Sequence, residues 1–440
     1  MVWLAAGTSQ AQSTPADQLL PSPQVLSRYG LERMWWGQGV LNPSRDRVHF
    51  LHADEDSVYV QSSNGTITAF DAESGQRRWA VRLGKFDAPT FRIATNEDQA
   101  TIVAGSFLCG LDKFSGRTLW RIRLPSQPST SPVIDDEQVY LGMLDGSVYA
   151  FSLKRIRELQ AESRLPEWTN DALVWRFRSS AELTSPPVLF DTRICFANRK
   201  GDVYGVTKST RELVFQFETN AGVVTPISRR GELLFVATEQ KAFYALKVKP
   251  RADMAVEQKS TKTVHSPLMK RDLESGKIAW EFTSGLPIRQ APIGMGSDLF
   301  LIPDRGGFYC LDAQTGVKKW WQPDAERFVA ATAGFIYASD EDQNLVIISR
   351  QDGQIVGRLP MRRFDMRLAN VRTDRLVLAT SRGYVLVLRE KGRTVPTFHT
   401  YPDRLPLMPE FESEDGEKKS GDDATEPESK NDDSAAPEST

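Results

Sequence analysis

The sequence predicts an all-β fold: an eight-bladed β-propeller of four-stranded antiparallel blades, with the ring closed by an N-terminal strand. Three observations predict this fold. A strand–turn–strand phrase recurs about every 40 residues, short segments alternate apolar and polar residues, and a Gly turn followed by Trp stands near the end of several repeats. Four strands at this period are typical of propeller blades, because one blade cannot bury both faces of its sheet and radial stacking does so.

The repeat is clearest in the third strand of each unit. Residues 65–71 read Gly-Thr-Ile-Thr-Ala-Phe-Asp, and related phrases stand at 146–151, 201–206 and 307–312. Intervals of 41, 40, 55, 40, 65, 37 and 40 residues separate the small or apolar residue near the end of this strand. The aligned residues are Ala69, Gly110, Ala150, Gly205, Ala245, Cys310, Ile347 and Val387. They predict eight units, two of which are lengthened.

Each unit is predicted to contain four short strands. The first follows a Pro-containing entry such as Ser131-Pro132, the second and third alternate apolar residues with period two, and the fourth follows the Gly turn near a Trp. Residues 29–37 resemble the turn and fourth strand of a repeat that lacks its earlier strands. We expect them to pair with the last unit, which covers sheet edges that would otherwise be exposed.

The turn after the third strand carries a recurring motif, Asp-x-x-(Ser/Thr)-Gly-x3-Trp. Asp and Ser/Thr can accept hydrogen bonds from the amides of the turn, and Gly can take a positive φ. The Trp is expected to pack its ring against the backbone of a neighbouring blade, and its indole N–H needs an acceptor. We predict a structural docking role for Asp71, Gly75, Trp79, Asp112, Gly116, Trp120, Trp175, Asp272, Gly276, Trp280, Asp312, Gly316 and Trp320.

This motif resembles the tryptophan-docking motif of the PQQ-like, quinoprotein-type β-propeller repeat family, over roughly residues 30–390. The family contains quinoprotein dehydrogenases, which hold PQQ and calcium at the propeller axis beside a disulfide of adjacent cysteines, and a non-catalytic BamB-like branch. The cysteines here, Cys109, Cys195 and Cys310, lie far apart in sequence. The resemblance therefore implies a protein-binding scaffold of the cell envelope with no enzyme activity and no cofactor. The alternatives are a quinoprotein-type dehydrogenase and a solitary carbohydrate- or peptide-binding module.

Composition excludes several other classes. Three Cys and four His rule out a disulfide scaffold and a Cys/His zinc module with normal ligand spacing. The absence of a run of about 20 apolar residues excludes a transmembrane helix. Residues 1–409 carry 52 basic and 45 acidic groups but no dense basic stripe, so nucleic acid is not an expected partner. We expect a monomeric propeller.

The chain is predicted to divide into three parts. Residues 1–28 read as a signal-like or disordered leader, since Ser9-Gln10-Ala11 has the pattern of a signal cleavage site, which predicts a periplasmic or otherwise exported protein. Residues 29–398 form the propeller. Residues 399–440 are expected to be an acidic disordered tail, because residues 410–440 hold 12 acidic and 3 basic groups with a single aromatic residue.

Two features are candidates for binding a protein partner. Insertions at about 153–172 and 248–271 fall between the third and fourth strands of their units, so we expect both on one face, the first with a short helix. Arg289, Arg327 and Arg367 precede the first strand in the last three repeats and are expected to crowd one sector of the channel mouth, where they can attract a carboxylate or an acidic peptide. Tolerated loops and solvated rim arginines are the respective alternatives.

Overall fold

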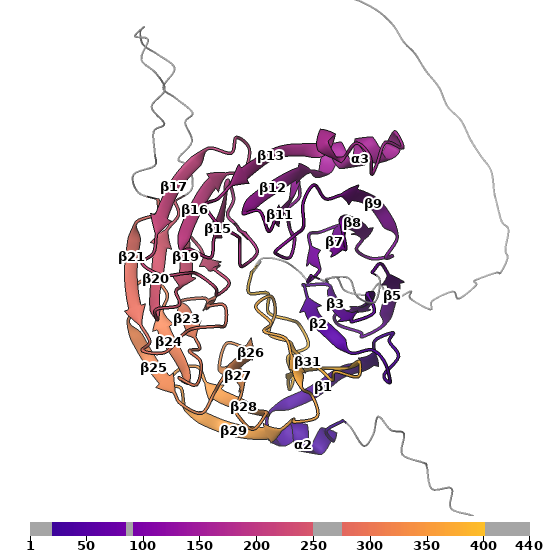
Figure 1. Cartoon of the computed structure of the whole chain (residues 1–440). Coiled ribbons are helices and arrows are strands. Elements are labelled where there is room, and N and C mark those ends of the chain that lie inside the picture. The colour runs from indigo at the N-terminus through magenta and orange to yellow at the C-terminus, as the bar shows by residue number, and fades with distance from the viewer. Residues whose placement is uncertain (1–19, 85–90, 250–274, 401–440) are drawn as a thin grey trace, which may run out of the picture. The chain divides into compact units, whose positions relative to one another are not determined.

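The protein is described here by a computed structural model that covers residues 20–84, 91–249 and 275–400. All of these residues belong to one compact unit. Eight four-stranded antiparallel sheets stand around a common centre (Figure 1). The predicted eight-bladed β-propeller is therefore confirmed, and the fourth strands of the blades lie on the outside of the ring.

The first four blades follow one another in the chain. Blade 1 is β2 (Val48–Ala53), β3 (Ser57–Ser62), β4 (Thr66–Asp71) and β5 (Arg77–Arg82); blade 2 is β6 (Ala94–Thr95), β7 (Gln99–Ala104), β8 (Phe107–Asp112) and β9 (Thr118–Arg123). Blade 3 is β10 (Val133–Ile134), β11 (Gln138–Gly142), β12 (Ser147–Ser152) and β13 (Leu173–Arg178); blade 4 is β14 (Val188–Leu189), β15 (Arg193–Ala197), β16 (Asp202–Thr207) and β17 (Leu213–Glu218).

The other four blades complete the ring. Blade 5 is β18 (Ser228–Arg230), β19 (Leu233–Ala237), β20 (Ala242–Lys247) and β21 (Ile278–Thr283); blade 6 is β22 (Ile293–Met295), β23 (Asp298–Leu301), β24 (Phe308–Asp312) and β25 (Lys318–Gln322). Blade 7 is β26 (Arg327–Ala331), β27 (Phe335–Ser339), β28 (Asn344–Ser349) and β29 (Ile355–Pro360); blade 8 is β30 (Met366–Arg367), β31 (Leu376–Ala379), β32 (Tyr384–Glu390) and β1 (Leu31–Gln38).

The N-terminal strand closes the ring, as predicted. β1 is the fourth strand of blade 8 and pairs antiparallel with β32, with Trp35 opposite Val387. Before β1, the helix α2 (Pro23–Arg28) begins at the N-cap Ser22 and buries Leu26 completely. The structured part of the chain thus starts inside the range 1–28 expected to be a leader, because Leu26 packs into the core cluster shared by blades 7 and 8. Residues 1–19 lie outside the described residues.

The chain after β32 returns toward the centre of the ring. Phe398 is bridged to Thr373, and the backbone N–H of His399 donates to the carbonyl of Arg372 at 2.8 Å. The His399 ring contacts the carbonyl of Ala331 through Nε2 at 2.9 Å. Residue 399, expected to begin the acidic tail, is therefore attached to the propeller, while residues 401–440 lie outside the described residues.

The alignment of third strands has a geometric basis. In five blades the aligned small residue lies directly opposite the Trp of the fourth strand, and in blade 4 Gly205 lies opposite Phe215. The pairs are Ala69 with Trp79, Gly110 with Trp120, Ala150 with Trp175, Ala245 with Trp280 and Cys310 with Trp320. The small residue leaves room for the ring: a Cβ on Gly110 would lie 2.1 Å from the Trp120 ring.

Most of these tryptophans pack on the Gly turn of the next blade. A Cβ on Gly116 would lie 2.6 Å from the Trp79 ring, and the Trp79 indole N–H donates to the carbonyl of Lys113 at 2.9 Å. The same contact joins Trp280 to Gly316. Two contacts of this type were absent from the sequence prediction, Trp35 on Gly75 and Trp320 on Gly353. Asp272 lies outside the described residues.

The Asp of the motif acts within its own turn. Asp71 Oδ1 accepts hydrogen bonds from the backbone N–H groups of Glu73 and Ser74 and from the Ser74 hydroxyl, at 3.1, 2.7 and 2.8 Å. Asp112 and Asp312 make the same set of bonds with their own turns. These bonds fix the Gly in position to receive the ring of the preceding blade.

Trp120 departs from this scheme. Blade 3 carries α3 (Leu153–Ala161) and the 3-10 helix η1 (Thr169–Ala172) where most other blades have the Gly turn, so no turn glycine of the next blade receives the Trp120 ring. Its indole N–H donates instead to Oε1 of Gln99, inside its own blade, at 2.9 Å. The ring is covered by the cluster that contains Leu153, Ile156 and Leu159 of α3. Trp120 therefore packs against the next blade as expected, but beneath its helix and not on a Gly turn.

Docking on glycine makes a first prediction. Gly116→Ala should lower the free energy of unfolding by more than about 1 kcal/mol, since φ is +72° there and the new Cβ would overlap Trp79. Chemical denaturation measures this loss. Gly105→Ala is the matched control, with φ +63° in the same blade and open space around its Cβ. Equal losses in the two variants would show that the Trp79 contact contributes nothing.

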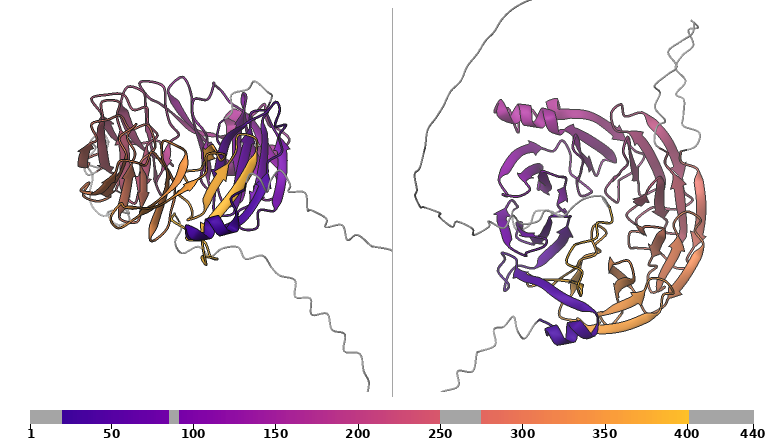
Figure 2. Two further views of the ribbon diagram at one scale, coloured as in Figure 1. Left: turned by 90° about the horizontal axis from the view of Figure 1, so that it is seen from below. Right: turned by 180° about the vertical axis from the view of Figure 1, so that it is seen from behind.

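Both insertions leave the ring between third and fourth strands, at the end that also carries the turns between first and second strands. α3 and η1 make up the first, and Figure 2 shows α2 and α3 on the rim. The second lies between β20 and β21, and its residues 250–274 are outside the described residues. None of the helices in the described ranges is long and apolar enough to span a membrane.

Candidate partner-binding surface

The two ends of the propeller carry different connections between strands. One end, here called the insertion end, carries the turns between first and second and between third and fourth strands. The other, the connection end, carries the turns between second and third strands and the links from blade to blade. Arg289 lies in the link from β21 to β22, Arg327 is the first residue of β26, and Arg367 contacts Gln343 in a second-to-third turn. The three predicted arginines therefore belong to the connection end, opposite the insertions.

Their placement differs in detail from the sequence prediction. Arg289 precedes its first strand as expected, but Arg327 and Arg367 lie within β26 and β30, because those strands begin earlier in the chain. Arg367 is held by Gln343, with NH1 on Oε1 at 2.6 Å and NH2 on the carbonyl. Burial, and then the charge of Arg327, lower the pKa of Arg367. Arg327 and Arg367 thus stand in the first strands of neighbouring blades, where the charge of one acts on the other.

Arg289 has a different environment. Its side chain is 74% exposed, and Nε lies 3.3 Å from Oδ2 of Asp304. Two exposed apolar side chains lie beside the same turn of blade 6. The Trp321 indole N–H donates to the carbonyl of Gly306 at 2.8 Å, and a Cβ on Gly306 would lie 3.1 Å from Leu286. We call Leu286, Arg289, Asp304 and Trp321 the Trp321 patch.

The Trp321 patch was not predicted from the sequence, although two adjacent Trp residues indicate it. Trp320 and Trp321 are adjacent in β25, and consecutive residues of a strand point to opposite faces of the sheet. Trp320 is accordingly buried while Trp321 is 47% exposed, with its ring tilted against Tyr309 and 6.1 Å between ring centroids. A pair of adjacent Trp residues in a strand therefore predicted one exposed aromatic ring.

Buried charges at the insertion end join neighbouring blades. Lys113, in the motif turn of blade 2, is 1% exposed and places Nζ 2.8 Å from Asp56 and 3.2 Å from Asp54 of blade 1. Burial by itself raises the pKa of Asp54, but Lys113 and the backbone N–H of Asp56 hold it below its usual value. Lys208 with Asp135 and Arg350 with Asp298 repeat this contact at 3.0 and 2.7 Å.

The cysteines and histidines of the described residues lie apart from one another. Cys109, Cys195 and Cys310 lie in three different blades, and burial raises the pKa of Cys109 to about 11 and of Cys310 to about 12. His52 is enclosed in blade 1, where burial lowers its pKa to about 4. Within residues 20–84, 91–249 and 275–400, no three His, Cys, Asp or Glu residues are grouped to hold a metal. This donor set does not fit PQQ with calcium.

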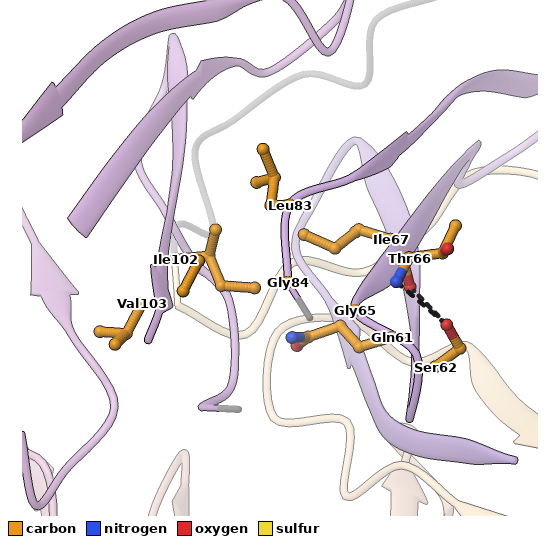
Figure 3. Close-up of a pocket in the computed structure, with 10 residues that line it drawn as sticks. Gln61, Ser62, Gly65, Thr66, Ile67, Leu83, Gly84, Ile102 and Val103 are labelled. Atoms are coloured by element: carbon orange, nitrogen blue, oxygen red, sulfur yellow. Dashed lines mark hydrogen bonds between the residues drawn. The ribbon is translucent and has the colours of Figure 1, made fainter. Parts of the chain in front are cut away.

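A small cavity lies between blades 1 and 2 (Figure 3). It is lined by residues of the β3–β4 hairpin and of β7, and its volume of about 10 Å³ accommodates about one water molecule. Its most polar side chain, Gln61, is already engaged, with Nε2 on the carbonyl of Phe91 and Oε1 accepting from Ile93 N–H, both at 2.9 Å. We interpret the cavity as a packing void.

Eight four-stranded blades, four of which dock a Trp on the glycine turn of the next blade, define a PQQ-like repeat β-propeller. The chain belongs to the family described as outer membrane protein assembly factor BamB, whose model matches residues 63–169, 158–251 and 261–404.

Two curated relatives carry the same description. The protein of Burkholderia pseudomallei (strain K96243) is 27% identical over 132 residues, 29% of this chain and 32% of that protein. The protein of Moranella endobia (strain PCIT) is 21% identical over 327 residues, 69% of this chain and 75% of that protein. The chain thus spans about a third of the length of the first relative and three quarters of the second.

Two solved structures share the fold. BamB from Moraxella catarrhalis has a TM-score of 0.58 at 15% identity and covers 82% of this chain and 98% of its own. The computationally designed Ika8 protein has a TM-score of 0.59 at 11% identity and covers 80% and 99%. A designed protein resembles this chain as closely as a natural one does, so these similarities show the fold alone.

Proposed function

We propose that this protein is a non-catalytic scaffold of the BamB type that binds another protein through its connection end. Family membership supports the general role, and the Trp321 patch is the observation that carries the proposal. Partner-binding surfaces are enriched in Trp and Arg at their centres, and a few such residues supply most of the affinity. The patch presents one exposed Trp and one exposed Arg side by side with Leu286.

The arginines suggest the chemistry of the partner. Arg327 is exposed and forms no ion pair within the part of the chain that the structure describes, and its charge lies close to that of Arg367. Two neighbouring cations favour a carboxylate that can contact both. We therefore propose a partner segment that combines an apolar side chain for the Trp321 patch with Asp or Glu side chains for Arg327 and Arg367.

The relatives suggest where the partner is found. Both are named outer membrane protein assembly factors, and on that basis we propose that this chain acts in the periplasm, on a protein of outer-membrane assembly. Affinity purification from the native envelope fraction, followed by binding measurements with the purified partner, tests this proposal. A partner that binds with unchanged affinity after the Trp321 patch, Arg327 and Arg367 are all replaced would contradict the proposal.

The Trp321 patch makes a second prediction. Trp321→Ala should weaken binding of the purified partner by about tenfold or more, the loss expected of a central interface Trp, with the melting temperature little changed. Calorimetric titration measures the affinity. Trp36→Ala is the matched control, because Trp36 is 43% exposed, stands in the fourth strand of another blade and lies 6.5 Å from the ring of Tyr384. The same loss in both variants would argue against a specific patch.

A further inference from the structure

The two ends of the propeller chain meet at an open groove beside the ring closure. The groove has a volume of about 670 Å³ and lies between α2, the start of β1 and the end of β32. Figure 1 shows α2 at the rim of the ring, next to β1. This volume is in the range of ligand sites in proteins. The groove lies apart from the connection end, so the proposed scaffold function does not use it.

Three basic side chains line the groove: Arg28 from the last turn of α2, Arg33 from β1 and Lys391 after β32. All three are exposed, and none pairs with a carboxylate of the described residues. The one carboxylate of the groove, Glu32, is engaged elsewhere, since Arg389 Nε lies 2.6 Å from its Oε1. The hydrogen bond from Arg389 lowers the pKa of Glu32, so this group stays ionised and paired. The groove therefore carries uncompensated positive charge.

The other lining groups add hydrogen-bonding capacity and an apolar floor. The Ser27 hydroxyl accepts a hydrogen bond from Lys391 Nζ at 3.1 Å, which positions the ammonium over the junction of the two chain ends. Gln24 contributes an amide, and Leu31 lies at the base of the groove. Arg and Lys side chains with neutral donors are the set that proteins use for phosphate oxygens.

We propose that this groove binds a phosphate-bearing anionic ligand, either a free phosphate compound or the headgroup of an anionic lipid. Arg28 and Arg33 come from the N-terminal segment and Lys391 from the C-terminal one, so an anion that contacts both sides also holds β1 against β32. The ligand thereby stabilises the closure of the ring. It binds the folded state and has no preformed site in the unfolded chain, which raises the melting temperature.

The experiment uses the full chain at low ionic strength. Inorganic phosphate and pyrophosphate are titrated by calorimetry, and vesicles of phosphatidylcholine with and without phosphatidylglycerol are tested by co-sedimentation. We expect one of these probes to bind the natural chain. The variant R28Q/R33Q/K391Q lacks the charged donors, so its affinity for that probe should be at least about tenfold lower. Binding of the phosphates identifies a soluble ligand, and binding restricted to phosphatidylglycerol vesicles identifies a lipid headgroup.

Amide hydrogen exchange distinguishes binding in the groove from a general effect of charge, because only a ligand in the groove protects particular strands. The bound ligand should slow the exchange of amides in β1 and β32 more than in β15 and β16 of blade 4, on another part of the ring. The control variant K200Q/R305Q/R382Q removes the same charge from exposed second-to-third turns of blades 4, 6 and 8, at the connection end and away from the groove, and should bind as the natural chain does. Equal weakening in the two triple variants, uniform protection of all blades, or no binding by the natural chain would overturn the proposal.

Discussion

Trp120→Ala should lower the free energy of unfolding by about 3–5 kcal/mol, the loss typical of a buried Trp replaced by Ala. The Trp120 ring is 1% exposed, the largest of the fully buried side chains among the described residues. The substitution leaves a cavity beneath α3 and removes the partner of Gln99 Oε1, which then lies buried without its hydrogen bond. Chemical denaturation followed by tryptophan fluorescence and circular dichroism measures the loss.

Trp321→Ala serves as the control for Trp120, since it removes the same side chain from an exposed site. We expect a change within about 0.5 kcal/mol there, as for most surface substitutions. Trp120→Phe separates the two contributions, because it keeps most of the ring volume and removes the indole N–H. A Trp120→Ala variant as stable as the natural chain would contradict the packing of blade 2 beneath α3.

Lys113→Met should destabilise the protein by about 3–5 kcal/mol at neutral pH, since it leaves two buried carboxylates without their cation. Lys113 is the shared partner of Asp54 and Asp56, and all three side chains are at most 5% exposed. Denaturation with urea across a pH series measures the loss. Lys319→Met is the matched control, because Lys319 pairs with Asp298 at 2.6 Å but is 33% exposed, and we expect a loss below about 1 kcal/mol.

The same contact predicts a pH dependence. The pKa of Asp54 is lower in the folded than in the unfolded protein, so its contribution to stability is present above the unfolded value of about 4 and is lost as the pH falls through the folded value. The difference between the natural chain and the Lys113→Met variant should therefore shrink as the pH drops below about 4. The triple variant K113M/D54N/D56N should recover part of the neutral-pH loss. An undiminished difference in acid would show that the ion pair is not its cause.

Sequence periodicity was sufficient for the architecture because a propeller repeats one local unit. The residues aligned in the third strands, such as Ala69 and Gly205, lie opposite the large ring of the fourth strand. The sequence alignment therefore corresponds to a cross-strand contact in each of these blades. The incomplete last unit and the motif fragment around Trp35 likewise predicted the pairing of β1 with β32. Each of these inferences depends on neighbours within one sheet or on the pattern of one strand.

The contacts of Trp120, Lys113 and Trp321 depend on which segments the ring brings together. The motif around Trp120 equals the motif around Trp79, yet α3 of the following blade replaces the Gly turn and changes its partner. Lys113 meets Asp56 across 57 positions of the chain, and no local pattern encodes that distance.

The sequence by itself determined the number of blades, the strand that closes them and most of the glycine turns that receive a tryptophan, because these follow from hydrophobic periodicity and turn chemistry. The tertiary structure alone decided which ends of the ring carry the arginines and the insertions, which Trp is left exposed, and that Arg28, Arg33 and Lys391 line one groove. Those relations are set by the packing of blade against blade, where residues far apart in the chain become neighbours.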